Sequence, residues 1–163
     1  MHLKFLSVVA AAFLLAACQS DTTGATGKPT SGGESGSGVM VGGPSEPTQE
    51  WLVMNIGDRV FFDYDRYELK ADARAVVEGW AGWLNQHPQL SLVVEGHADE
   101  RGTREYNLAL GNRRANTTME YLTAMGVDSG RLAIVSFGKE RPAVLGSSEA
   151  AYSQNRRGVL VLN

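Results

Sequence analysis

The pattern of apolar and polar residues changes twice along the chain and divides it into three regions. Residues 6–17 are apolar except for Ser7, residues 20–49 are mostly polar, and residues 51–163 carry regular hydrophobic patterns. Only the last region has enough apolar residues for a core, and its length of about 113 residues is typical of one compact domain. We therefore divide the chain into a leader (1–17), a tether (18–50) and a folded domain (51–163).

The domain pattern predicts alternating strands and helices. Residues 57–62, 90–95, 131–137 and 158–162 are rich in β-forming residues and are expected to be strands. Between the first two, apolar residues recur with a helical period at Leu69, Ala73, Val76, Val77, Trp80, Trp83 and Leu84. We expect both tryptophans to belong to the core, and His87-Pro88 to end this helix.

A second helix is expected over about residues 105–125, because Gly126 supplies a C-terminal stop. Its predicted core stripe consists of Leu108, Ala115, Met119 and Leu122. Residues 138–152 are expected to form a loop. The order βαβα followed by ββ predicts an α/β (α+β) sandwich, in which a mixed sheet is backed by two main helices.

The leader has the features of an export signal. Its apolar run of twelve residues is too short to cross a hydrocarbon layer of roughly 30 Å, and it fits the central part of a secretory signal. The run ends in Leu15-Ala16-Ala17-Cys18, which resembles the lipobox of bacterial lipoproteins. This resemblance implies that residues 1–17 are removed and that Cys18 carries covalent lipid. Because Gln19 rather than aspartate follows, it also implies the outer membrane. The alternative is an ordinary signal peptide with a chance cysteine.

The tether is expected to be flexible. Of the thirty residues from Ser20 to Gln49 within it, twenty-one are glycine, serine, threonine or proline, and such a stretch cannot bury enough apolar surface to fold. As a coil it would span about 30 Å on average.

Composition and charge exclude several classes of protein. A net charge of -3 and a pI near 5.6 argue against a nucleic-acid binder. A single cysteine excludes an intrachain disulfide. His97, Asp99 and Glu100 are close in sequence, but without a distant histidine or cysteine they are a weak metal site. No catalytic constellation is apparent, so we expect no enzyme activity, no metal and no cofactor beyond the lipid on Cys18.

Two oppositely charged residues are candidates for binding a ligand. Asp99 lies in a loop after the second strand, and Arg114 follows fifteen residues later in the second helix, on the same side as Asn107 and Leu110. Helical side chains lean toward the N-terminus, so Arg114 can reach toward Asp99. Facing one cleft, Asp99 would accept the ammonium of a zwitterion and Arg114 would bind its carboxylate. The alternative is a structural salt bridge between the two. Arg156 and Arg157 are expected at a solvated strand end, and the alternative is that they pair with an acidic surface or with the wall.

Four blocks of the domain resemble the OmpA-like peptidoglycan-binding domain family. They are residues 60–67, 95–103, 105–115 and 151–157. The resemblance implies the fold of that family and noncovalent binding of meso-diaminopimelate in the peptide stem of the wall. It implies that Asp99 and Arg114 make the defining contacts, and that further site residues are Tyr64, Asp65, Arg101, Thr103, Asn107 and Leu110. Gly111 departs from many members, which have serine there.

The resemblance also implies partners and leaves rivals. It implies that the protein ties the outer membrane to peptidoglycan and binds the periplasmic β-propeller protein TolB. The rivals are a wall hydrolase, a stator-type or porin-linked relative, and a protein-binding lipoprotein whose wall site is degenerate. A stator-type or porin-linked relative needs a membrane part, and no segment after Cys18 has the length.

Overall fold

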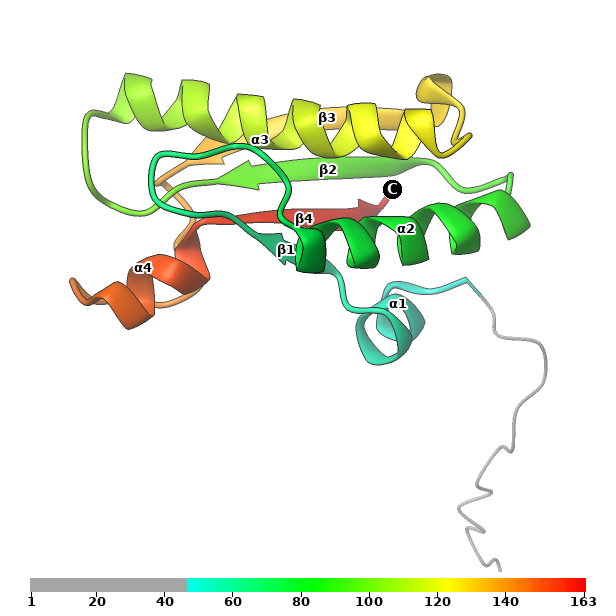
Figure 1. Ribbon diagram of the computed structural model, residues 1–163, viewed down its shortest axis with the longest axis horizontal. Helices are drawn as coiled ribbons and strands as arrows, with labels where there is room; N and C mark the ends of the chain where they lie inside the picture. The colour runs from blue at the N-terminus through cyan, green and yellow to red at the C-terminus, as the bar shows by residue number, and fades with distance from the viewer. Residues whose placement is uncertain (1–46) are drawn as a thin grey trace, which may run out of the picture. The chain divides into compact units, whose positions relative to one another are not determined.

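A computed structural model of the chain describes residues 47–163, and the predicted leader, Cys18 and most of the predicted tether lie outside this range. The described residues form helices and strands in the order α1 (Gln49–Asn55), β1 (Arg59–Phe61), α2 (Ala71–Gln86), β2 (Leu92–His97), α3 (Arg104–Ala124), a 3-10 turn (Ser129–Arg131), β3 (Leu132–Gly138), α4 (Glu149–Asn155) and β4 (Arg157–Leu162) (Figure 1).

The strands form one mixed sheet in the spatial order β1-β4-β2-β3. Strand β4 lies antiparallel to both β1 and β2, whereas β2 and β3 are parallel. A parallel pair needs a crossover connection, and α3 supplies it. The predicted α+β sandwich with a mixed sheet and two main helices is confirmed.

Helices α2 and α3 cover one face of the sheet (Figure 1), and the core lies between these layers. Strand β2 alternates, with Leu92 and Val94 turned toward the helices and fully buried. Trp80 is completely buried and donates from its indole N–H to the Gly57 carbonyl over 2.7 Å. Trp83 is also buried and stacks on Trp51 with ring centroids 5.6 Å apart. Both tryptophans therefore belong to the core, as predicted.

Helix α3 lies directly against the backbone of β2 at a contact between two glycines. A Cβ atom on Gly96 would overlap the Gly111 carbonyl, and a Cβ on Gly111 would approach the Gly96 oxygen to 2.8 Å and collide with the Ser136 hydroxyl. A serine at position 111 therefore has no room here, which gives a physical reason for the glycine.

The predicted core stripe of α3 is wrong at its first member. Leu108 is 46% exposed, and the buried side of the helix consists of Asn107, Leu110, Gly111, Arg114, Ala115, Thr118 and Leu122. The reason is that the first half of this side packs glycine against backbone and uses polar side chains to bond nearby carbonyls. A search for apolar residues at helical spacing cannot detect such a side.

Two short helices were not predicted. Helix α4 lies partly within the predicted loop 138–152 and is capped by Ser148, whose hydroxyl accepts from the Ala151 N–H over 3.2 Å. Helix α1 begins at Gln49, two residues before the predicted start of the domain. The Gln49 side chain donates to the Leu160 carbonyl over 3.1 Å and accepts from the Leu162 N–H over 2.9 Å. Helices of seven residues are too short to show a reliable period.

Arg156 and Arg157 do not lie at a solvated strand end, so this prediction is wrong. Both side chains are buried. The Arg156 guanidinium donates to the Phe62 carbonyl over 3.1 Å, and that of Arg157 donates to the Arg141 carbonyl over 3.1 Å. Two consecutive arginines in a sequence do not indicate which backbone carbonyls will surround their side chains in the fold.

Across residues 47–163, none of the helices combines the length and the apolar character needed to cross a bilayer.

The glycine contact generates a stability prediction. Gly96→Ala should lower the free energy of unfolding by at least about 3 kcal/mol, because the new methyl group forces α3 away from β2. The control is Gly82→Ala, an exposed position in α2 where a Cβ meets nothing within 4 Å. It should raise the free energy of unfolding by about 0.5 kcal/mol or more. Urea denaturation measures both, and equal stability of the two variants would contradict the contact.

Candidate functional site

A pocket of about 330 Å³ opens where β2 ends and α3 begins. The eight residues singled out from the sequence all line it, and the structure adds Gly102, Tyr106 and Arg156 to them. The eight are Tyr64, Asp65, Asp99, Arg101, Thr103, Asn107, Leu110 and Arg114. They come from three separate segments of the chain, and the fold brings their side chains together around one pocket. Their role in binding stays a prediction.

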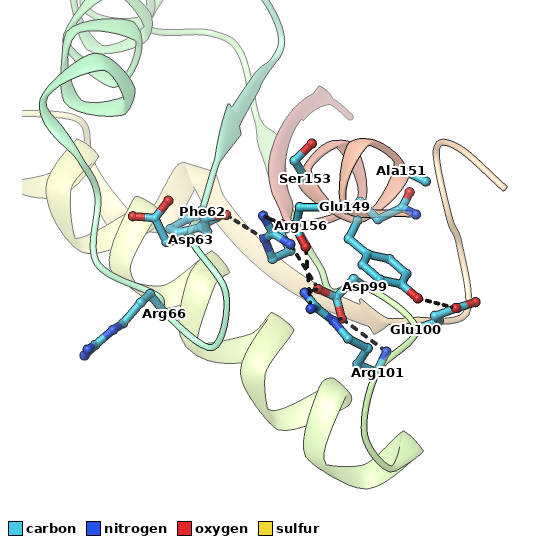
Figure 2. Close-up of polar contacts among 12 residues, drawn as sticks. Phe62, Asp63, Arg66, Asp99, Glu100, Arg101, Glu149, Ala151, Ser153 and Arg156 are labelled. Atoms are coloured by element: carbon cyan, nitrogen blue, oxygen red, sulfur yellow. Dashed lines mark hydrogen bonds and ion pairs between the residues drawn. The ribbon is translucent and has the colours of Figure 1, made fainter. Parts of the chain in front are cut away.

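Asp99 is the buried acid of the pocket, with 4% of its surface exposed. Its Oδ1 accepts from the backbone N–H of Arg101 over 3.1 Å and from Arg101 Nε over 3.3 Å. Its Oδ2 lies 2.6 Å from Arg101 Nη2 and 3.3 Å from Arg156 Nη1 (Figure 2). Burial by itself raises the pKa of Asp99, but these bonds to Arg101 and Arg156 outweigh burial and hold the pKa below its ordinary value. Asp99 is therefore a carboxylate at neutral pH.

Arg114 is the buried cationic side chain of the pocket, and its exposed fraction is 0%. Its Nε, Nη1 and Nη2 donate to the carbonyls of Arg66 (2.8 Å), His97 (2.7 Å) and Asp63 (3.1 Å). Burial lowers the pKa of Arg114 to about 10, so the side chain stays charged at neutral pH. The salt bridge with Asp99, left open from the sequence, is not the arrangement in the structure. Since a guanidinium has five N–H donors, two are not bonded to these carbonyls.

Arg101 covers Asp99 from the solvent side. Its guanidinium lies over the Tyr64 ring, 4.0 Å from the centroid, and over the Tyr152 ring, 4.4 Å from that centroid. Its backbone carbonyl accepts from Asn107 Nδ2 over 2.8 Å, which ties the loop to α3. The next residue, Gly102, has φ +92, a left-handed conformation that favours glycine.

The other wall of the pocket is formed by the loop after β1 and the first turn of α3. Thr103 is the N-cap of α3, and its hydroxyl accepts from the Tyr106 N–H over 3.2 Å. The Tyr106 hydroxyl in turn donates to Asp65, and this bond raises the pKa of Tyr106. Asp65 has φ 54, an uncommon left-handed conformation for a non-glycine residue. The positive end of a helix of 21 residues thus faces the pocket and favours a bound anion.

Sequence reasoning missed the residues of α4 that contact the arginines of the pocket. Glu149 Oε1 lies 2.7 Å from Arg156 Nη2, and its Oε2 lies 3.5 Å from Arg101 Nη1 (Figure 2). Asp99, Arg101, Glu149 and Arg156 therefore form a closed ring of alternating charges, called the charge ring below. The only early signal was that residues 151–157 form one of the resembling blocks.

His97 sits behind the pocket and is 1% exposed. Its Nε2 lies 3.3 Å from Glu95 Oε2, its Nδ1 has no hydrogen-bond partner, and its ring stacks on Phe137. Burial, aided by the charges of Arg157 and Arg141, lowers the pKa of His97 to about 4. In the described part of the chain, no three histidine, cysteine or acidic side chains are grouped so that they could hold a metal ion.

Comparison with known proteins identifies the class of the domain. The model of the OmpA family matches residues 61–156, which include the whole pocket and strands β2 and β3. The solved structure of the C-terminal domain of MotB from Helicobacter pylori shares the fold, with a TM-score of 0.61 at 20% identity over 65% of this chain and 84% of that chain. Fold and pocket thus define an OmpA-like domain.

Relatives with higher sequence identity define a group within the OmpA family. The peptidoglycan-associated lipoprotein of Brucella melitensis is 47% identical over 83% of this chain and 79% of its own length. That of Haemophilus influenzae is 42% identical over 96% of this chain and 95% of its own length. The crystal structure of the Burkholderia pseudomallei protein of the same name has a TM-score of 0.64 at 42% identity, over 65% of this chain and 90% of that chain. The chain therefore belongs to the OmpA family, within the group of peptidoglycan-associated lipoproteins.

The buried imidazole generates a prediction of pH dependence. Since the pKa of His97 falls from 6.5 to about 4 on folding, the unfolded chain binds more protons than the folded chain between these two values. The free energy of unfolding should therefore fall as the pH falls through this window, by about 1.5 kcal/mol between pH 6.5 and pH 5. Urea denaturation across this range should show a much flatter profile for His97→Gln. His87→Gln, which removes a histidine at the end of α2, should keep the wild-type slope, and a flat wild-type profile would contradict the argument.

Proposed function

We propose that the chain is an outer-membrane lipoprotein whose domain faces the periplasm of a Gram-negative bacterium and binds peptidoglycan noncovalently. The ligand is the tip of meso-diaminopimelate in the peptide stem, where an ammonium and a carboxylate are bound to one carbon. Binding, not bond cleavage, is the function. The observation that carries this proposal is a single pocket that contains both a buried carboxylate, Asp99, and a buried guanidinium, Arg114.

The pocket offers each charge of the ligand a partner of opposite sign. Asp99 is held ionised by its surroundings and accepts the ammonium. Arg114 has two N–H groups beyond those bonded to carbonyls, and the first turn of α3 adds backbone N–H groups, so the carboxylate has donors on two sides. A ligand with only one of the two charges leaves part of this arrangement unpaired, which favours a zwitterion.

The names of the relatives support binding to peptidoglycan. These proteins carry the name peptidoglycan-associated lipoprotein across several bacteria. By the same relationship we propose that the protein is a component of the Tol–Pal system, that TolB is its protein partner, and that it contributes to envelope integrity and cell division. The lipid on Cys18 would hold the protein in the membrane while the domain binds the wall.

Wall binding is tested with purified sacculi that contain diaminopimelate. Asp99→Asn keeps the size of the side chain and removes its charge, so it should weaken binding at least about thirtyfold, the equivalent of about 2 kcal/mol. The matched control is Glu100→Gln, an exposed neighbour outside the pocket, which should bind like the wild type. Cosedimentation measures both, with a thermal melt of each variant to establish folding. A folded Asp99→Asn that still sediments like the wild type would disprove the site.

The same preparations separate the remaining rivals. A protein-binding lipoprotein with a degenerate wall site would capture purified TolB but fail to sediment with wild-type sacculi. A wall hydrolase would release soluble muropeptides during the incubation. We expect sedimentation, capture of TolB and no release.

Lipid anchoring has a separate test. Cys18→Ser removes the thiol that would carry the lipid, so the protein should lose its label from radioactive palmitate and move from the membrane fraction to the soluble periplasm. Sacculus binding by the soluble variant should be unchanged. Continued labelling of Cys18→Ser would show that the lipobox assignment is wrong.

A further inference from the structure

In the free protein, Asp99 has no acceptor position left for a ligand. A carboxylate offers about four lone-pair positions. The backbone N–H, Nε and Nη2 of Arg101 and the Nη1 of Arg156 supply four donors, at distances between 2.6 and 3.3 Å. A ligand ammonium can therefore reach Asp99 only after one of these donors has moved away.

The geometry decides which donor can move. The backbone N–H is fixed by the loop. Arg156 is 6% exposed, and it is bonded to the Phe62 carbonyl and to Glu149 as well as to Asp99 (Figure 2). The side chain of Arg101 is 34% exposed and rests between two tyrosine rings, and its bond to Glu149 is long, at 3.5 Å. The guanidinium of Arg101 is therefore the donor that is free to leave.

We infer that Arg101 is a specificity-determining residue: its guanidinium occupies the ammonium position at Asp99 in the free protein, and only a ligand that offers a carboxylate as well as an ammonium displaces it. This inference rests on the proposed function and deepens it. The ligand ammonium replaces Arg101 at Asp99, and the ligand carboxylate gives the displaced guanidinium a new partner inside the same pocket. One charge pair, between Asp99 and Arg101, is thus replaced by two.

A ligand with one kind of charge cannot complete this exchange. A simple amine would have to expel Arg101 from Asp99 and leave that guanidinium with the distant Glu149 as its only acidic partner in the charge ring. A simple carboxylate would draw Arg101 away and leave Asp99 with fewer donors in a buried position, which is unfavourable. Rejection of single charges is thus a property of Arg101 and of the rings and acid that hold it, Tyr64, Tyr152 and Glu149.

Three probes that share the central carbon chain of diaminopimelate test the exchange. They are meso-diaminopimelate, cadaverine, which retains both amines and lacks both carboxylates, and pimelate, which retains both carboxylates and lacks both amines. Affinities are measured by NMR titration of the full chain in detergent. For the wild type we expect binding of diaminopimelate and at least tenfold weaker binding, by order of magnitude, of each of the other two.

The deciding variant is Arg101→Gln, which removes the guanidinium that occupies Asp99. Two donors to Asp99 remain, the guanidinium of Arg156 and the backbone N–H of residue 101. Cadaverine should bind this variant at least about tenfold more tightly than it binds the wild type, and the preference for diaminopimelate over cadaverine should fall by about the same factor. Tyr152→Leu keeps the cation but removes one of its two rings, so affinity for diaminopimelate should rise about threefold. Arg104→Gln, an exposed arginine outside the pocket, should behave like the wild type in all titrations.

The outcomes are distinguishable. An Arg101→Gln variant that melts like the wild type but shows no gain in cadaverine binding overturns the inference, even if diaminopimelate binds. A wild type that fails to bind diaminopimelate overturns the proposed function, while the cadaverine titration still decides whether Arg101 blocks Asp99. A gain in cadaverine binding by Arg101→Gln, with diaminopimelate bound by the wild type, supports both.

Discussion

The buried guanidinium of Arg114 is the interaction on which the pocket depends. A charge without access to water is costly unless it is hydrogen-bonded. Here three carbonyls from two segments bond to it: Asp63 and Arg66 in the loop after β1, and His97 at the end of β2. These bonds fix the loop that carries Tyr64 and Asp65 relative to the strand that leads to Asp99. The glycine contact between α3 and β2 is what allows the helix to bring Arg114 so close to these carbonyls.

Around this fixed guanidinium, the pocket is electrically balanced before any ligand arrives. The charge ring contains two acids and two arginines. Leaving Asp99 unpaired in a buried position would be unfavourable, and the ring avoids this. A ligand that binds at Asp99, as we infer, would have to rearrange the ring. Its affinity would then depend on the difference between two sets of charge pairs, and such a difference is more sensitive to the chemistry of the ligand than a contact with an unpaired charge.

The sequence predicted the parts of the fold that repeat with a clear period. Strands β1 to β4 follow from runs of β-forming residues, and helices α2 and α3 from helical spacing, as with Val77, Trp80 and Leu84. The burial predicted for Leu108 and the exposure predicted for Arg156 were wrong, and the two seven-residue helices were not predicted. In these places the structure is determined by backbone carbonyls, caps and a glycine contact. The eight pocket residues were found through resemblance and one charge pattern, whereas Glu149 and Tyr152 belong to a helix that the pattern did not reveal.

Strand β4 has a mechanical consequence through its two ends. Arg156, directly before the strand, lines the pocket, and the carbonyl of Leu160 and the N–H of Leu162 bond to Gln49, where the N-terminal chain enters the domain. If the pocket binds the wall and the lipid on Cys18 holds the N-terminal end, as proposed, a pulling force between the two would run lengthwise along β4, which is paired on both sides by β1 and β2. Such shear would load many ladder hydrogen bonds at once instead of opening them one after another, and the domain would then be oriented to resist tension.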